Sequence, residues 1–74
     1  MDVHNLVHMA NRIGDFFQAM PDREEAVEGI AEHLRKFWEP RMRRLMLEHV
    51  DQAGTAALHP LMAQAVQEQR ASLL

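Results

Sequence analysis

The stretch of sequence that decides the fold is Arg35-Lys36-Phe37-Trp38-Glu39-Pro40-Arg41-Met42-Arg43-Arg44. Pro40 has no backbone N–H and disfavours helical geometry in the residue before it, so a helix arriving from the N-terminal side ends near Trp38. Proline is well tolerated at the first position of a helix, where its N–H would have no helical partner. The stretch therefore predicts two helices joined by a very short turn.

Apolar residues at helical spacing predict one helix on each side of this junction. The helix before it starts after an N-cap at Asp22, ends near Trp38 and carries the stripe Val27, Ile30, Leu34 and Phe37. The helix after it is expected over about 40–52, stops at Gly54 and carries the stripe Met42, Leu45, Met46, His49 and Val50.

Two further helices are expected towards the ends of the chain. One helix is expected over about 3–19, with Asp2 as its N-cap and Pro21 as its stop. Val3 and Phe16 widen its apolar stripe, whose main members are Leu6, Ala10, Ile13, Phe17 and Met20. A narrower, Ala-rich stripe predicts a weaker C-terminal helix over about 60–72, with the members Leu61, Met62, Ala65 and Val66. The predicted fold class is all-α, a small helical bundle of three to four short helices with proline-marked junctions.

The length of the chain and its lack of cysteine limit the ways in which such a bundle can be stabilised. The 74 residues predict a single helical domain over 1–74, with its core in 3–52 and the weaker helix outside that core. A domain of this size buries only about 60% of the surface that its unfolded chain exposes. Because the chain has no Cys, disulfides, cysteine-ligated zinc and thiolate-ligated iron–sulfur clusters are excluded. Helix packing, self-association or a partner protein must supply the stability.

Charge and hydropathy narrow the classes of partner. No apolar run approaches the roughly 20 residues that span a bilayer, and no signal peptide is visible, so we expect a cytoplasmic protein that does not bind membranes. Eight Lys and Arg against eleven Asp and Glu give a net charge of -3, which argues against nucleic acid as the main partner. Acidic residues gather in 22–32, whereas five of the eight basic residues lie in 35–44.

The side chains that carry chemistry do not form a complete catalytic or metal site. His4 and His8 share one helix face, but a metal site needs a third and usually a fourth ligand. Thr55 and Ser72 are the only hydroxyl side chains, and both lie near helix ends, where capping is their ordinary role. No catalytic companion is visible for the remaining histidines, His33, His49 and His59. We therefore assign no catalytic, cofactor-binding or metal-binding residue.

The junction at 35–44 is the best candidate for a binding surface, because Trp and Arg are over-represented at the hot spots of protein interfaces. We assign Phe37 to the core, and we expect Trp38, Arg41, Arg43 and Arg44 to form a partner interface. The alternative for Trp38 is that it also belongs to the core. A rival role for the arginines is to contact phosphates in a helix-turn-helix-like pair, which the overall acidity and the proline-only turn oppose.

Two glycines lie inside predicted helices, where glycine costs up to about 1 kcal/mol relative to alanine. Our hypothesis for Gly14 and Gly29 is that two helices approach closely there. The alternative is that both glycines lie on exposed faces, where their cost is tolerated.

Three phrases in order along the chain are Met9-Ala10-Asn11-Arg12-Ile13-Gly14-Asp15-Phe16-Phe17, Met20-Pro21-Asp22-Arg23-Glu24-Glu25-Ala26 and Arg35-Lys36-Phe37-Trp38-Glu39-Pro40-Arg41-Met42-Arg43. Together they resemble the delta subunit of NAD-dependent formate dehydrogenases. The resemblance covers nearly the whole chain, and the tail after Gly54 matches least well.

The resemblance implies a non-catalytic accessory subunit of a cytoplasmic formate dehydrogenase, assisting the assembly or stability of the formate-oxidising holoenzyme. In that family the larger subunits carry the molybdenum or tungsten pterin, the iron–sulfur clusters, the flavin and the NAD site. Those subunits are the expected partners, and this chain is expected to hold no cofactor. The isolated chain could form a homo-oligomer. The alternative function is a small helical nucleic-acid-binding or self-associating regulatory protein.

Overall fold

The computed structural model describes residues 2–74. Five helices follow one another in this range: α1 Val3–Phe17, α2 Arg23–Phe37, α3 Pro40–Ala53, α4 Pro60–Glu68 and α5 Arg70–Leu73. No strand occurs among the described residues. The predicted all-α bundle is confirmed, with the single turn of α5 as an additional element.

The helices begin and end where the capping residues predict. The Asp2 carboxylate accepts a hydrogen bond from the His4 N–H at 2.9 Å, and the Asp22 carboxylate accepts from the N–H groups of Glu24 at 2.9 Å and Glu25 at 3.2 Å. Pro40 occupies the first turn of α3. Gly54 ends α3 with a φ of 77°, in the region that glycine adopts without steric cost.

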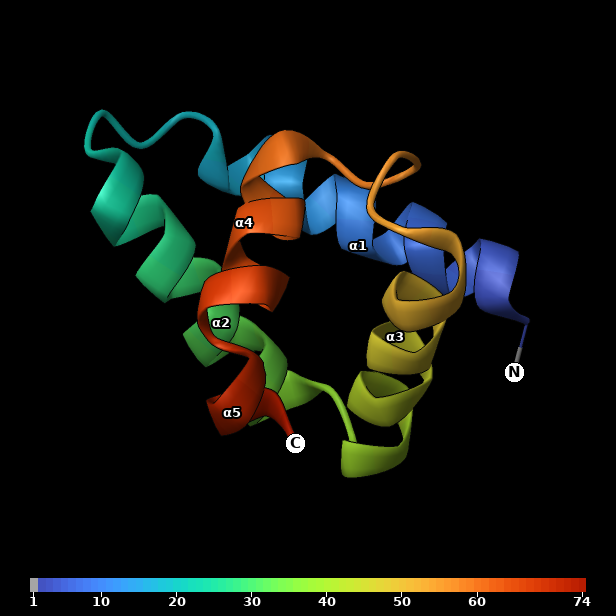
Figure 1. Cartoon of the computed structure of the whole chain (residues 1–74). Coiled ribbons are helices and arrows are strands. Elements are labelled where there is room, and N and C mark those ends of the chain that lie inside the picture. The colour runs from blue at the N-terminus through green and yellow to red at the C-terminus, as the bar shows by residue number, and fades with distance from the viewer. Residues whose placement is uncertain (1) are drawn as a thin grey trace.

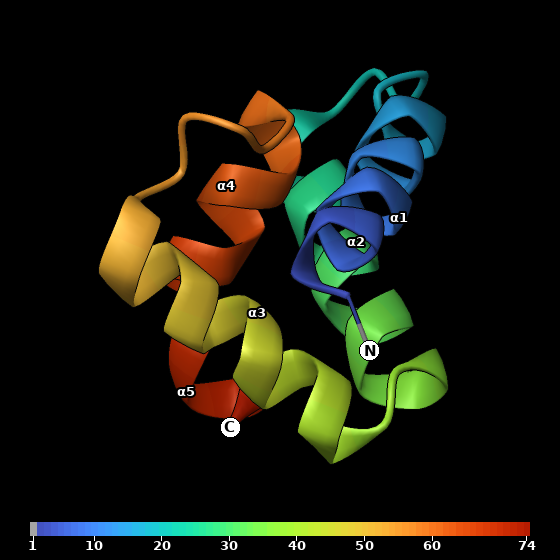
Figure 2. The same ribbon diagram turned by 90° about the vertical axis from the view of Figure 1, so that its right-hand side faces the viewer.

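The chain folds back so that its C-terminal helices cover its N-terminal ones. Figure 2 shows α1 and α2 on one side of the molecule and α3, α4 and α5 on the other. In Figure 1, α4 runs down between α1 and α2 after the long connection from α3, and it contacts both of them. The single turn of α5 then reaches α2 and α3. None of the helices described is long and apolar enough to cross a membrane.

The buried apolar residues extend beyond the core expected over 3–52. The connection before α4 and the two C-terminal helices contribute Leu58, Leu61, Met62, Ala65, Val66 and Leu73, each at most 6% exposed. The predicted helix over 60–72 is interrupted at Gln69, so that α5 turns and brings Leu73 into the core. The narrow Ala-rich stripe, from which we expected little burial, suits a helix packed against two others because small side chains let helices approach closely.

Both internal glycines lie under a side chain from another element. A Cβ atom on Gly14 would lie 2.7 Å from Cγ and 2.8 Å from Cβ of His59, the residue before α4. A Cβ atom on Gly29 would lie 2.6 Å from Cε1 of Phe17 on α1. The predicted close approach is therefore present at both glycines, although a side chain makes it in each case rather than the backbone of a second helix.

We predict that Gly14→Ala lowers the free energy of unfolding by about 1–3 kcal/mol, because the new methyl group overlaps the part of His59 nearest its backbone. Gly29→Ala should cost less, since it meets the edge of a partly exposed phenylalanine ring that can turn away. Urea unfolding of both variants measures the difference.

The control for this prediction is Gly14→Ala in a His59→Gly background. There the overlap is gone and alanine favours the helix by up to about 1 kcal/mol, so the substitution should be neutral or stabilising. An equal loss of stability in both backgrounds would show that His59 is not what excludes a side chain at position 14.

Candidate functional site

Trp38 ends α2 and turns into the core. Its N–H donates to the Leu34 carbonyl at 3.0 Å, and its extended backbone, with a φ of −91° and a ψ of 131°, leaves the helical path before Pro40. The indole is only 5% exposed and belongs to the buried cluster that contains Leu34 and Met46. The structure therefore places Trp38 in the core, the alternative to the partner contact that we favoured, because the helix break redirects its side chain inward.

The Arg43 guanidinium ties this junction to the C-terminal end of the chain. Its Nε donates to the Leu73 carbonyl at 3.0 Å, and its Nη1 donates to the carbonyls of Trp38 at 2.9 Å and Arg35 at 3.2 Å. The last carbonyls of a helix lack partners within that helix, and Arg43 supplies donors at the end of α2. Beside it, Arg35 donates through Nη1 to the Ser72 hydroxyl at 2.8 Å. The Arg43 guanidinium therefore stabilises the fold of this chain.

The four residues of the predicted partner interface do not form one continuous surface. Trp38 and Arg43 are used within the chain, as described above. Arg41 and Arg44 are exposed on α3, and their side chains make no hydrogen bond or ion pair with any other residue in 2–74. A partner contact at this junction stays a prediction, and it now depends on Arg41 and Arg44.

The exposed aromatic side chains lie instead on α1 and α2. Phe16 is 75% exposed and Phe37 is 70% exposed. The assignment of Phe37 to the core is wrong, because the chain leaves the helix directly after it and Trp38 enters the core in its place. Phe16, which we expected to widen the buried stripe of the helix over 3–19, is also exposed, whereas its neighbour Phe17 packs against the core.

Phe16, Phe17, His33 and Phe37 form a row of rings across α1 and α2, which we call the aromatic patch. Ring centroids are 5.2 Å apart for Phe16 and Phe17, 6.2 Å for Phe17 and His33, and 4.9 Å for His33 and Phe37. The first two pairs meet edge to face, an arrangement that aromatic rings favour. Two helices thus bring four rings together on the surface.

The outer face of α2 beside this patch is acidic. Glu24, Glu25, Glu28 and Glu32 are all exposed there. Lys36 forms an ion pair with Glu32 at 2.8 Å, and its hydrogen bond and positive charge lower the pKa of that carboxyl. A lowered pKa in the folded state adds stability above the ordinary pKa of Glu, which is lost as the pH falls through the lowered value. This contribution is small, because both side chains are more than half exposed.

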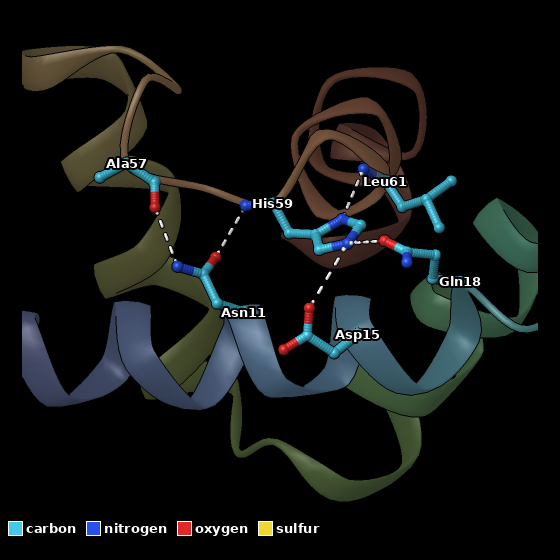
Figure 3. A network of polar contacts seen from close by, with 6 residues as sticks. All are labelled: Asn11, Asp15, Gln18, Ala57, His59 and Leu61. Atoms are coloured by element: carbon cyan, nitrogen blue, oxygen red, sulfur yellow. Dashed lines mark hydrogen bonds and ion pairs between the residues drawn. The ribbon is translucent and has the colours of Figure 1, made fainter.

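Polar contacts fasten the connection before α4 to α1 (Figure 3). Asn11 makes two of them: its Nδ2 donates to the Ala57 carbonyl at 2.9 Å, and its Oδ1 accepts from the His59 N–H at 2.7 Å. The His59 ring then caps α4, since its Nδ1 accepts from the Leu61 N–H at 3.1 Å. Its Nε2 lies 2.7 Å from Oε1 of Gln18 at the end of α1.

The capping contact fixes the tautomer of His59. Because Nδ1 accepts a hydrogen bond, the proton of the neutral ring lies on Nε2 and is donated to Gln18. The Asp15 carboxylate is 3.6 Å from the same nitrogen and more than two thirds exposed. Both ring nitrogens are engaged in holding α4 against α1, which gives His59 a structural role.

The other side chains considered for catalysis or metal binding lie apart from one another. His4 and His8 are exposed on α1, and within 2–74 no three His, Asp or Glu side chains gather where they could hold a metal ion. The Ser72 hydroxyl donates to the Gln69 carbonyl at 2.9 Å while it accepts from Arg35. These side chains therefore do not come together in one site, and the exposed surface of α1 and α2 is the remaining candidate for a functional site.

We predict that Arg43→Ala lowers the free energy of unfolding by about 1–3 kcal/mol, because three partly buried carbonyls lose their donor. The matched control is Arg44→Ala, one residue away on the same helix and exposed, which should change it by less than about 0.5 kcal/mol. Chemical unfolding monitored by Trp38 fluorescence compares them. Equal stability of the two variants would contradict the role of Arg43.

Comparison with known proteins adds one finding. A family model described as NADH-dependent formate dehydrogenase delta subunit FdsD matches residues 5–66. The match contains all three phrases on which the resemblance rests, and it ends within α4. No curated protein and no solved structure matches the chain.

Proposed function

Since this chain belongs to the delta-subunit family of NADH-dependent formate dehydrogenases, we propose that it is a non-catalytic accessory subunit that helps to assemble or stabilise the formate-oxidising holoenzyme. The observation that carries this proposal is the family match over residues 5–66 of 74. Its partners are the larger subunits of that enzyme.

The use of the polar side chains supports the absence of a catalytic role. His59 uses both ring nitrogens to hold α4, and Ser72 uses its hydroxyl to join Arg35 to the C-terminal turn. Iron–sulfur clusters are held mainly by cysteine thiolates, and this chain has no Cys. The residues present therefore do not fit such a cluster.

We accordingly assign the pterin metal centre, the iron–sulfur clusters, the flavin and the NAD site to the larger subunits. A cytoplasmic location completes the proposal, and the absence of Cys suits a reducing compartment.

We predict that cells lacking this chain accumulate less complete formate dehydrogenase than the parent strain, while each assembled metal centre turns over formate at the parental rate. An accessory subunit changes how many complexes form or survive, since it adds no group to the reaction. Purification through a tag on a larger subunit, with subunit stoichiometry, molybdenum or tungsten content and NAD-linked formate oxidation measured together, separates the two quantities.

Re-expression of the wild-type chain is the control and should restore the yield. Two results would contradict the proposal. One is a lower turnover per metal centre at an unchanged yield, which would place the chain in the reaction itself. The other is failure of the tagged wild-type chain to co-purify with any larger subunit.

A further inference from the structure

We propose that the aromatic patch of Phe16, Phe17, His33 and Phe37 is the surface that docks this chain on a larger subunit of the formate dehydrogenase. The inference rests on the proposed function and adds to it the surface and the chemistry of the partner.

The patch contains apolar surface that the chain does not use in its own fold. Four large apolar side chains are exposed among the described residues, and three of them, Met9, Phe16 and Phe37, lie on α1 and α2. Met9 and Phe16 are seven residues apart and therefore share one face of α1, about two turns from each other. Contiguous apolar surface on a small soluble protein marks an interaction site far more often than isolated apolar residues do.

The rings also pack against one another before any partner arrives. The Phe17 ring rests on Gly29, close enough that even a methyl group would not fit between them, and it contacts both Phe16 and His33 edge on. His33 in turn contacts Phe37. Rings that already pack against one another lose less conformational entropy on binding than isolated side chains would, which favours them as aromatic anchors in an interface.

The area of the patch favours a larger subunit over a second copy of this chain. Phe16 and Phe37, which are 75% and 70% exposed, present roughly 150 Å² each, so that the two together offer roughly 300 Å². A stable interface of standard size needs about 800 Å² from each partner. Two patches laid face to face fall short of that area, whereas an apolar pocket on a larger subunit can enclose both rings and contact the helices around them.

The charges beside the patch define the rim of that pocket. The exposed glutamates Glu24, Glu25, Glu28 and Glu32 line the α2 border, where Lys36 is paired with Glu32. Lys or Arg side chains on the partner would complement this border, and anionic phosphates of nucleic acid or lipid would be repelled by it. The partner is therefore an apolar pocket with a basic rim along the edge that meets α2.

The test uses the complete enzyme, purified through a tag on a larger subunit from cells that express variants of this chain. The variant Phe16→Ser/Phe37→Ser changes two exposed side chains and should leave the melting temperature of the isolated chain nearly unchanged. Its affinity for the complex should fall about tenfold for each phenylalanine, because aromatic anchors dominate interface energies. The matched control is Leu74→Ser, which removes an exposed apolar side chain outside the patch and should bind normally.

A third variant, Arg41→Ser/Arg44→Ser, tests the exposed arginines of α3, and sedimentation of each isolated chain tests self-association. The proposed surface is supported if only the phenylalanine variant is lost from the complex. It is overturned if that variant is retained in full, if the arginine variant alone is lost, or if the patch proves to hold a homodimer while binding to the complex is unchanged. Failure of the wild-type chain to bind contradicts the proposed function instead, so the two failures are distinguishable.

Discussion

The packing of α4 against both α1 and α2 is the interaction on which the rest of the structure depends. It joins the C-terminal part of the chain to its beginning and buries Leu61, Met62, Ala65 and Val66 at the centre. The polar contacts of Asn11 and His59 set where α4 starts, and Gly14 leaves room for the His59 ring. Arg43 secures the opposite end by donating to the carbonyl of Leu73, the last residue of α5. A chain without cysteine, and therefore without disulfides, is closed in this way by two sets of polar contacts, one before α4 and one at the end of α5.

This arrangement determines which side chains remain for a partner. The single core takes in Trp38 from the end of α2 and is completed by α4 and α5. Phe16 and Phe37 stay outside on the faces of α1 and α2 that α4 does not cover. A domain of this size buries a modest fraction of its surface, so exposed aromatic rings beside a charged helix face fit a subunit whose stability is completed by association. Membership of a delta-subunit family agrees with such a role.

Local signals in the sequence predicted where the helices begin and end, but they did not predict which side chains lie on the surface. Asp2, Asp22, Pro40 and Gly54 act through neighbouring backbone groups, so the helix boundaries that they predict are close to those observed. The exposure of Phe37 and the burial of Trp38 depend on how the chain turns between α2 and α3, which a helical period does not describe. The central position of α4 and the bond from Arg43 to the Leu73 carbonyl join residues 30 or more positions apart, and no local pattern encodes them. The exposure of Phe16 is likewise not encoded locally, since the consecutive residues Met46 and Leu47 of α3 are both buried.

Oxidative footprinting of the free chain and of the assembled enzyme tests most directly the claim that Trp38 is internal while Phe16 and Phe37 face the partner. Hydroxyl radicals modify exposed aromatic side chains, and mass spectrometry locates each modification. The account predicts that Phe16 and Phe37 are modified in the free chain and protected in the complex, and that Trp38 is protected in both states. Modification of Trp38 in the free chain with protection on assembly, while the two phenylalanines stay equally reactive, would contradict it and return the interface to the helix junction at Pro40.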